Sequence, residues 1–375
     1  MNRRIRIAST VALSTILILC FQNFTNIPSS TAPSCDSQAD VSTNLGTDQF
    51  YEFQHGGRNR SYIVHVPSGY VPSKPTDVVF ALHGGFGTAC QVRQDSLLND
   101  LPERYGNTSY PNKKYPFFNS PFIVVYPNGV ADISIYGDGG QHWNSGRVSR
   151  ARVDDVDFVH KILDRLGSAH RLNVNWQRIF AVGISNGGTM AYTLAQKSTR
   201  FTAIAAIAAL LPTDFVDEGA PPLKAIPTMV ISGTGDGLMF WDGGLTGKPN
   251  SETVVLSGEE TFAKLSAAIG SPPTQLKSYF DWLSPGITQF DWYCQSQWGF
   301  HVRNKKRVEL IKIYGGGHCW PGPHANALVI SGGFCAQGLD ASAEALVFFD
   351  NQPNLATPIK NCKPGYKIVS GDCVN

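Results

Sequence analysis

The segment Arg178–Gly188 reads Arg-Ile-Phe-Ala-Val-Gly-Ile-Ser-Asn-Gly-Gly and decides the fold of this chain. Its first half is an apolar run that predicts a buried strand, and the residues after it, Asn186–Lys197, have the spacing of a helix. Between them lies a G-x-S-x-G pattern with Ser185 at its centre. Small residues on both sides allow a sharp turn, which brings the serine hydroxyl to a helix N-terminus where negative charge is stabilised. The alternative is an ordinary glycine turn whose serine caps the helix.

Further apolar runs alternate with helical segments on both sides of this turn. The predicted strands cover residues 61–67, 77–84, 121–127, 203–209, 227–233 and 307–314, and the predicted helices include 155–171 and 341–349. Short apolar strands that alternate with helices indicate an α/β fold, with a mainly parallel central sheet covered by helices on both faces. Ligands of such sheets bind beyond the carboxyl ends of the strands, so we expect the chemistry in the loops that follow strands.

A serine hydroxyl becomes a good nucleophile only when a neighbouring base takes its proton. His318 is the candidate base, because it follows the last predicted strand through Gly315-Gly316-Gly317, a loop that lets an imidazole reach back over the sheet. His324 lies further along the same loop and is the more distant alternative. We expect His83 to support the glycine turn that follows it.

The base in turn needs an acid that orients its ring. Asp236 follows the predicted strand 227–233 through Gly233-Thr234-Gly235, and Asp242 is its rival in the next turn. The resulting order along the chain, Ser185, Asp236, His318, is the nucleophile–acid–base order typical of the α/β-hydrolase fold.

Preorganised donors should stabilise the oxyanion that forms when the serine attacks. One is the backbone amide of Asn186, and the other comes from Gly85 or Phe86 in the glycine-rich loop after strand 77–84. Trp143 and Trp320 are candidates for lining the substrate cleft, with packing in the core or on the surface as the alternative for both.

Composition excludes several other classes of function. The 375 residues carry 31 Lys and Arg against 29 Asp and Glu, a net charge of +2, without the clustered basic stripe of a nucleic-acid-binding protein. The acidic cluster Asp154, Asp155 and Asp157 is explained by capping of the helix that follows. The cysteine spacing matches no zinc pattern. We therefore expect no cofactor and no metal.

The first 26 residues are predicted to be a secretory signal peptide, since basic Arg3, Arg4 and Arg6 precede a short apolar core. A membrane anchor is the alternative, but the apolar core is shorter than the roughly 20 residues that cross a bilayer. Residues 27–46 are predicted to be a linker, 47–352 the catalytic domain and 353–375 a cysteine-containing tail. We thus expect a secreted protein that is not stably inserted in a membrane after the signal is cleaved.

Eight cysteines suit an oxidising compartment. Loss of Cys20 with the signal peptide leaves an odd number, and Cys362–Cys373 is the one disulfide that we predict, across a tight loop. Residues 271–301 are rich in aromatic residues and proline but lack clear periodicity, which favours a surface insertion or lid.

Several motifs together resemble a known family. They are Arg60–Pro67, Leu82–Gly85, Tyr126–Gly129, Asp154–Phe158, Gly183–Gly188, Gly233–Asp236 and Gly317–Gly322. Across residues 51–350 the chain resembles the secreted esterases that include feruloyl esterases and polyhydroxybutyrate depolymerases. The resemblance implies a serine carboxylic ester hydrolase with Ser185, Asp236 and His318 as its triad. Gly237 stands where the family often has proline.

The expected function is hydrolysis of an ester through an acyl-enzyme, on a substrate such as feruloylated or acetylated plant cell-wall polysaccharide. Depolymerisation of a polyhydroxybutyrate polyester is the alternative within the family. A peptidase would differ only in the leaving group. The hypothesis of another class is a carbohydrate-binding protein without catalysis, and a complete triad argues against it.

Overall fold

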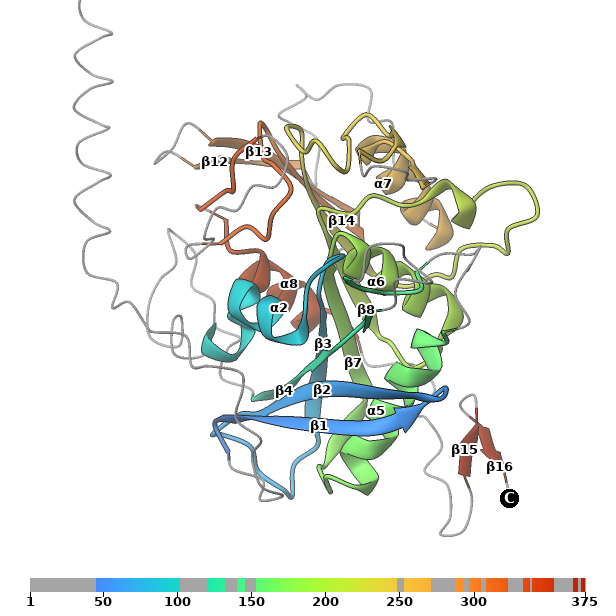
Figure 1. Ribbon diagram of the computed structural model, residues 1–375. Coiled ribbons are helices and arrows are strands. Elements are labelled where there is room, and N and C mark those ends of the chain that lie inside the picture. Colours follow the sequence, from blue (N-terminus) through green and yellow to red (C-terminus); the bar gives the residue numbers. More distant parts are fainter. Residues whose placement is uncertain are drawn as a thin grey trace, which may run out of the picture.

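A ten-stranded sheet with the order β1-β2-β4-β3-β7-β8-β9-β14-β13-β12 runs through the centre of the computed structural model (Figure 1). Its strands are β1 Thr47–His55, β2 Arg58–Val66, β3 Thr76–Leu82, β4 Phe122–Pro127, β7 Val174–Ile184, β8 Ala203–Ile207, β9 Thr228–Gly233, β12 Ile287–Trp292, β13 Gln297–Asn304 and β14 Val308–Ile313. The ladders from β4 through β3, β7, β8 and β9 to β14 are parallel, and those at both edges are antiparallel. The predicted α/β fold with a mainly parallel sheet is confirmed, and its strand order is that of an α/β-hydrolase.

The structure describes residues 45–101, 121–131, 140–145, 153–247, 253–270, 287–292, 297–304, 308–322, 333–337, 339–353, 367–369 and 372–374. For β12, β13 and the two short strands near the C-terminus, β15 Lys367–Val369 and β16 Asp372–Val374, it describes the backbone alone. The predicted signal peptide, most of the predicted linker, His324 and Cys362 lie outside these residues. The signal peptide and the Cys362–Cys373 disulfide therefore stay predictions.

Both faces of the sheet are buried under helices, which explains why its central strands are continuously apolar. In β3, Val78, Phe80 and Leu82 belong to one buried cluster, whereas Val79 and Ala81 belong to the other. Side chains alternate between the two faces of a strand, so the clusters are the two layers of the core.

Three helices pack on the first face, α5 Asp155–Ser168, α6 Asn186–Lys197 and α7 Gly258–Ala268. The second face is covered by α2 Ala89–Ser96 and α8 Ala341–Asp350, which lie together on the other side of the sheet in Figure 1. Short 3-10 helices cover Leu98–Asp100 and Thr213–Phe215. Within the described residues, no helix combines the length and apolar character needed to cross a bilayer.

The structure describes the predicted insertion or lid, residues 271–301, at two stretches of backbone. Its backbone at Ile287–Trp292 and Gln297–Asn304 forms the antiparallel strands β12 and β13, which extend the sheet beyond β14. The aromatic residues Phe290, Trp292, Trp298 and Phe300 thus belong to strands at an added edge of the sheet.

Because β3, β7, β9 and β14 are parallel, the loops after them emerge at the same edge of the sheet. These loops carry Gly85, Ser185, Asp236 and His318 respectively. The fold therefore delivers the residues predicted for chemistry to one edge.

Candidate active site

Ser185 occupies the turn between β7 and α6 in a conformation that is unusual for a residue with a side chain. Its φ is 56° and its ψ is −122°. A conformation of this kind costs on the order of 1–3 kcal/mol and persists only where its surroundings enforce it. Here the surroundings are close backbone contacts: a Cβ on Gly183 would collide with the carbonyl of Gly187, and one on Gly187 with the carbonyl of Leu82. The Ser185 amide also donates to the carbonyl of Ile207 at 2.9 Å.

His318 and Asp236 form a buried hydrogen-bonded pair beyond β14 and β9. The distance between His318 Nδ1 and Asp236 Oδ2 is 2.8 Å. The other carboxylate oxygen, Oδ1, accepts from the backbone amides of Leu238 and Met239, at 2.8 Å each. Because the carboxylate accepts at both oxygens, His318 donates from Nδ1, and Nε2 is left as the basic nitrogen of the neutral ring. The rival Asp242 is exposed.

The loops that carry this pair are joined closely to each other. The Thr234 amide donates to the carbonyl of Ile313, and the Gly235 amide to that of Gly316, both at 2.9 Å. A side chain at Gly233 would collide with the carbonyl of Gly316, so glycine is required at this contact. The acid and base loops therefore form one unit.

A disulfide links Cys319, directly after His318, to Cys335. The segment around Cys335 also pairs with the base loop through its backbone: the Gly317 amide donates to the carbonyl of Phe334 at 2.8 Å, and the Phe334 amide to that of Gly315 at 3.1 Å. The base loop is thus held on both sides, by the acid loop and by this cross-linked segment. The Cys319–Cys335 disulfide was not predicted from the sequence. The position of a cysteine directly after His318 was the signal available for it.

The glycine loop after β3 packs directly on the serine turn. A Cβ built on Gly84 would lie 3.5 Å from Ser185 Cβ, and one on Gly85 would lie 3.8 Å from Asn186 Cβ. The Phe86 amide is engaged, because it donates to the carbonyl of Gln141 at 2.8 Å. Among the described residues the Gly85 amide has no acceptor, which favours Gly85 over Phe86 as the oxyanion donor.

His83 supports this loop, in agreement with the expectation from sequence. Its Nδ1 donates to the carbonyl of Gly84 at 2.7 Å, and its Nε2 accepts from the Gly129 amide at 2.8 Å. Burial lowers the pKa of His83 from 6.5 to about 4, because the charged imidazolium is poorly solvated there. The ring is therefore neutral at pH 7 and acts as a fixed connection between two loops.

The side chain of Asn186 connects the serine turn to the strand β6 Gln141–His142 and the residues after it. Its Oδ1 accepts from the Trp143 amide at 2.7 Å, and its Nδ2 donates to Ser145 Oγ at 2.8 Å. His142, which the sequence did not single out, is buried beside Gly85: its Nδ1 would lie 3.0 Å from a Cβ on that glycine. These contacts fix the walls around the proposed oxyanion donors.

The two tryptophans predicted to line the cleft are buried. Trp143 is 2% exposed and donates from Nε1 to the carbonyl of His83 at 2.9 Å. Trp320 is 4% exposed and donates from Nε1 to Ser342 Oγ at 2.9 Å. Each indole N–H is satisfied inside the protein, which favours the packing alternative over substrate contact for both residues.

The acidic cluster before α5 is occupied by structural contacts. Asp154 caps the helix by accepting from the Asp157 amide at 2.9 Å, and Asp155 forms a buried ion pair with Arg60 at 2.6 Å. Asp157 contacts His55 Nε2 at 2.9 Å. In the part of the chain that the structure describes, no group of three or more His, Cys, Asp or Glu side chains is arranged to hold a metal ion.

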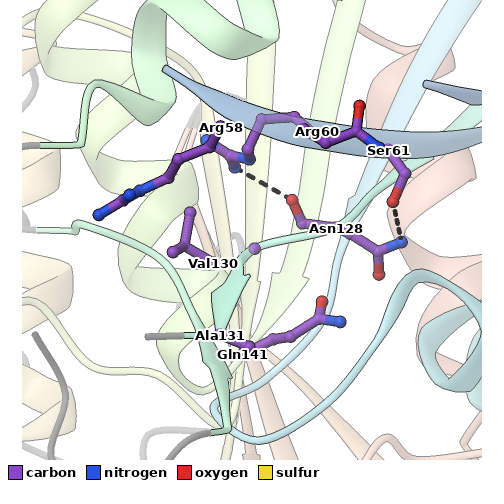
Figure 2. A pocket seen from close by; sticks show the side chains of 9 residues that line it. Arg58, Arg60, Ser61, Asn128, Val130, Ala131 and Gln141 are labelled. Atoms are coloured by element: carbon purple, nitrogen blue, oxygen red, sulfur yellow. Dashed lines mark hydrogen bonds between the residues drawn. The ribbon is translucent and has the colours of Figure 1, made fainter. Parts of the chain in front are cut away.

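A separate cavity of about 320 Å³ lies beyond the end of β4 (Figure 2). Its lining residues are Arg58, Asn59, Arg60, Ser61, Asn128, Gly129, Val130, Ala131 and Gln141. Figure 2 shows two hydrogen bonds in this cavity. The Arg60 guanidinium donates to the backbone carbonyl of Asn128 at 3.0 Å, and the side-chain Nδ2 of Asn128 donates to Ser61 Oγ at 2.9 Å. Gln141, whose carbonyl accepts from Phe86, connects this cavity to the glycine loop.

No family model matches the chain. It is 27% identical over 290 residues to "Putative esterase NocK" of Nocardia uniformis subsp. tsuyamanensis, a match that covers 73% of this chain and 75% of that protein. It is 27% identical over 265 residues to "Feruloyl esterase B" of Piromyces equi, covering 69% of this chain and 42% of the relative, so the chain spans less than half the length of that protein.

"Feruloyl esterase C" of Emericella nidulans is also 27% identical, over 230 residues that cover 61% of this chain and 71% of the relative. The relatives support hydrolysis of carboxylic esters as the activity of this chain. The chain thus has an α/β-hydrolase strand order and is similar in sequence to proteins named as esterases, two of them feruloyl esterases.

Proposed function

We propose that the protein is a secreted serine esterase that removes feruloyl or acetyl groups from plant polysaccharide. Ser185 is the nucleophile, His318 the base and Asp236 the acid, within a catalytic domain that spans residues 47–352. The observation that carries the proposal is the buried His318–Asp236 pair, at 2.8 Å, on the sheet edge that also holds the strained turn of Ser185.

In the first step His318 Nε2 takes the proton of Ser185 Oγ while Oγ bonds to the ester carbonyl carbon. The electron pair of the C=O bond moves to its oxygen, and the amides of Gly85 and Asn186 donate to this oxyanion. Collapse of the intermediate re-forms C=O and breaks the bond to the alcohol, which leaves with the proton from His318. Water then repeats the sequence on the acyl-serine, releases the acid and restores the serine.

The burial of the pair supports these roles physically. The carboxylate of Asp236 faces the imidazolium that forms in each step, and a charge in a site with little water interacts more strongly than in bulk water.

The test is hydrolysis of p-nitrophenyl acetate by the wild type and by Ser185→Ala. The variant should lose about 10⁶-fold in kcat, because the other groups cannot replace a missing nucleophile. Circular dichroism and thermal unfolding of both proteins control for folding. Equal activity in the two proteins would rule out Ser185 as the nucleophile, and an inactive wild type would favour a binding protein.

The substrate is tested separately with methyl ferulate, an acetylated xylan and short 3-hydroxybutyrate oligomers. We expect turnover of the first or the second, in keeping with the feruloyl esterases among the relatives. Preferred turnover of the hydroxybutyrate oligomers would assign a polyester depolymerase instead. Export is tested by N-terminal sequencing of the protein from culture medium, which should begin after residue 26.

A further inference from the structure

Phe86 combines two features that are rarely found together in a large apolar residue. The residue is 57% exposed, and its backbone has a φ of 67°. The left-handed region is strained for a bulky residue, and exposing a phenyl ring to water forgoes the gain from burying it. A conformation that is unfavourable in both respects is characteristic of a functional position.

The exposed ring is also held in place. The Phe86 amide donates to the carbonyl of Gln141 at 2.8 Å, which anchors the backbone. The ring meets that of His142 edge to face, with centroids 4.9 Å apart and planes at 68°. Gly140 lies directly against it, since a Cβ at that position would be 2.5 Å from Phe86 Cδ1. The ring is therefore a preorganised surface, and contact with a ligand costs little additional ordering.

The position of this ring relative to the proposed chemistry is set by its neighbours in the chain. Phe86 directly follows Gly85, which packs against Asn186, and these two residues supply the proposed oxyanion donors. His142, on which the ring rests, lies against the same glycine. An ester whose carbonyl oxygen is bound at these amides thus has the ring beside it.

We propose that the phenyl ring of Phe86 determines acyl specificity, by packing against the aromatic ring of a hydroxycinnamoyl ester. This inference rests on the proposed function and adds the residue that distinguishes an aromatic from a small acyl group. A flat aryl group can pack on Phe86 in an offset or edge-to-face arrangement, whereas an acetyl group is too small to cover the ring.

The experiment compares kcat/KM for methyl ferulate, ethyl acetate and phenyl acetate in the wild type, Phe86→Asn and Phe86→Tyr. Asparagine removes the ring and tolerates the left-handed backbone, so the glycine loop should keep its shape. Phe86→Asn should lose about tenfold on methyl ferulate, which corresponds to about 1.4 kcal/mol. Its loss on ethyl acetate should be clearly smaller than its loss on methyl ferulate, and Phe86→Tyr should retain the preference of the wild type for methyl ferulate.

Val71→Ala is the matched control, because Val71 is 40% exposed in the loop that enters β3, at the opposite edge of the sheet. An equal loss on all three esters would overturn the inference, since the residue would then act through the oxyanion loop. A loss confined to phenyl acetate would place the ring against the alcohol instead. An unchanged kcat/KM of Phe86→Asn on methyl ferulate would also overturn the inference. If Ser185→Ala still abolishes hydrolysis, the proposed function stands independently of Phe86.

Discussion

The carboxylate of Asp236 accepts hydrogen bonds at both of its oxygens. Two backbone amides donate to Oδ1 and the ring of His318 donates to Oδ2. An asparagine at this position has only one acceptor oxygen, but acceptors are needed both for the two backbone amides and for the ring of His318. If the amide oxygen stays with Leu238 and Met239, the NH2 group faces His318, and the ring must present an unprotonated Nδ1. Its proton then sits on Nε2, the nitrogen that should accept from Ser185.

We therefore predict that Asp236→Asn lowers kcat by about 10⁴-fold, as expected when the base is held in the wrong tautomer. The substitution is nearly isosteric, so the far-UV circular dichroism spectrum should be unchanged. Steady-state kinetics on p-nitrophenyl acetate measure the effect, with Asp242→Asn as the matched control in the neighbouring turn. A smaller loss in Asp236→Asn than in Asp242→Asn would assign the acid to Asp242.

Among the structural elements, the loop after β14 depends on a covalent cross-link to the segment that follows it. Cys319 and Cys335 are 16 residues apart and close a loop around the segment that follows His318. Cross-linking a loop of about this length stabilises a fold by about 3 kcal/mol through the lost entropy of the unfolded chain. The same bond restricts the motion of the residue next to the base.

The double variant Cys319→Ser/Cys335→Ser should accordingly unfold at lower denaturant, with a free energy of unfolding reduced by about 2–4 kcal/mol. Its kcat should fall severalfold at nearly constant KM, because a loosely held base affects proton transfer more than ester binding. Dithiothreitol should lower the activity of the wild type by a larger factor than that of the variant, which has already lost this disulfide. Unaltered kcat in the variant would limit the disulfide to a role in stability.

The elements that the sequence predicted well are those whose signals are local. Helix α6 spans Asn186–Lys197 as predicted, because the glycines before it and its apolar spacing act within one short segment. Helix α7 was missed although Ser257 and Glu260 form a capping box at its start, a signal that was present in the sequence. Strand β1 at Thr47–His55 was missed because its role comes from pairing with β2 at the sheet edge.

In the candidate site too, features with local sequence signals could be predicted, whereas features that depend on tertiary contacts could not. Ser185, Asp236 and His318 could be proposed from the sequence because each follows a strand through glycines, and parallel strands end at one edge. The hydrogen bond from the Phe86 amide to the carbonyl of Gln141 joins segments far apart in the chain, so no local pattern could reveal it. For the disulfide, the sequence offered the cysteine beside His318 but did not identify its partner. The burial of Trp143 and Trp320 likewise depends on tertiary packing.

For the molecule as a whole, buried neutral histidines make stability depend on pH. Burial lowers the pKa of both His83 and His160 from 6.5 to about 4. Between these two values the unfolded chain binds protons that the folded chain does not, so the free energy of unfolding falls as the pH is lowered from 6.5 to 4. The contribution is fully present above pH 6.5 and lost below pH 4.

We predict that the difference in unfolding free energy between the wild type and His83→Gln shrinks as the pH falls from 7 to 4, by up to about 3 kcal/mol. Carboxylates titrate equally in both proteins, so their contribution to the unfolding free energy cancels in this difference. Urea unfolding at pH 7, 5.5 and 4 measures it, and both proteins must be folded at pH 7. A difference that is constant or grows with acidity would contradict a neutral, buried His83.

The glycine contact between the acid and base loops has a consequence for how this edge of the molecule can change. Neither Gly233 nor the backbone around Gly316 leaves space for a side chain, so a substitution in one loop has to be matched by a shift of the other. Recombination with a homologue at a point between residues 236 and 308 would separate two partners that fit only each other. Sequence variation at this edge is therefore expected to require exchange of the Asp236 loop and the His318 loop together.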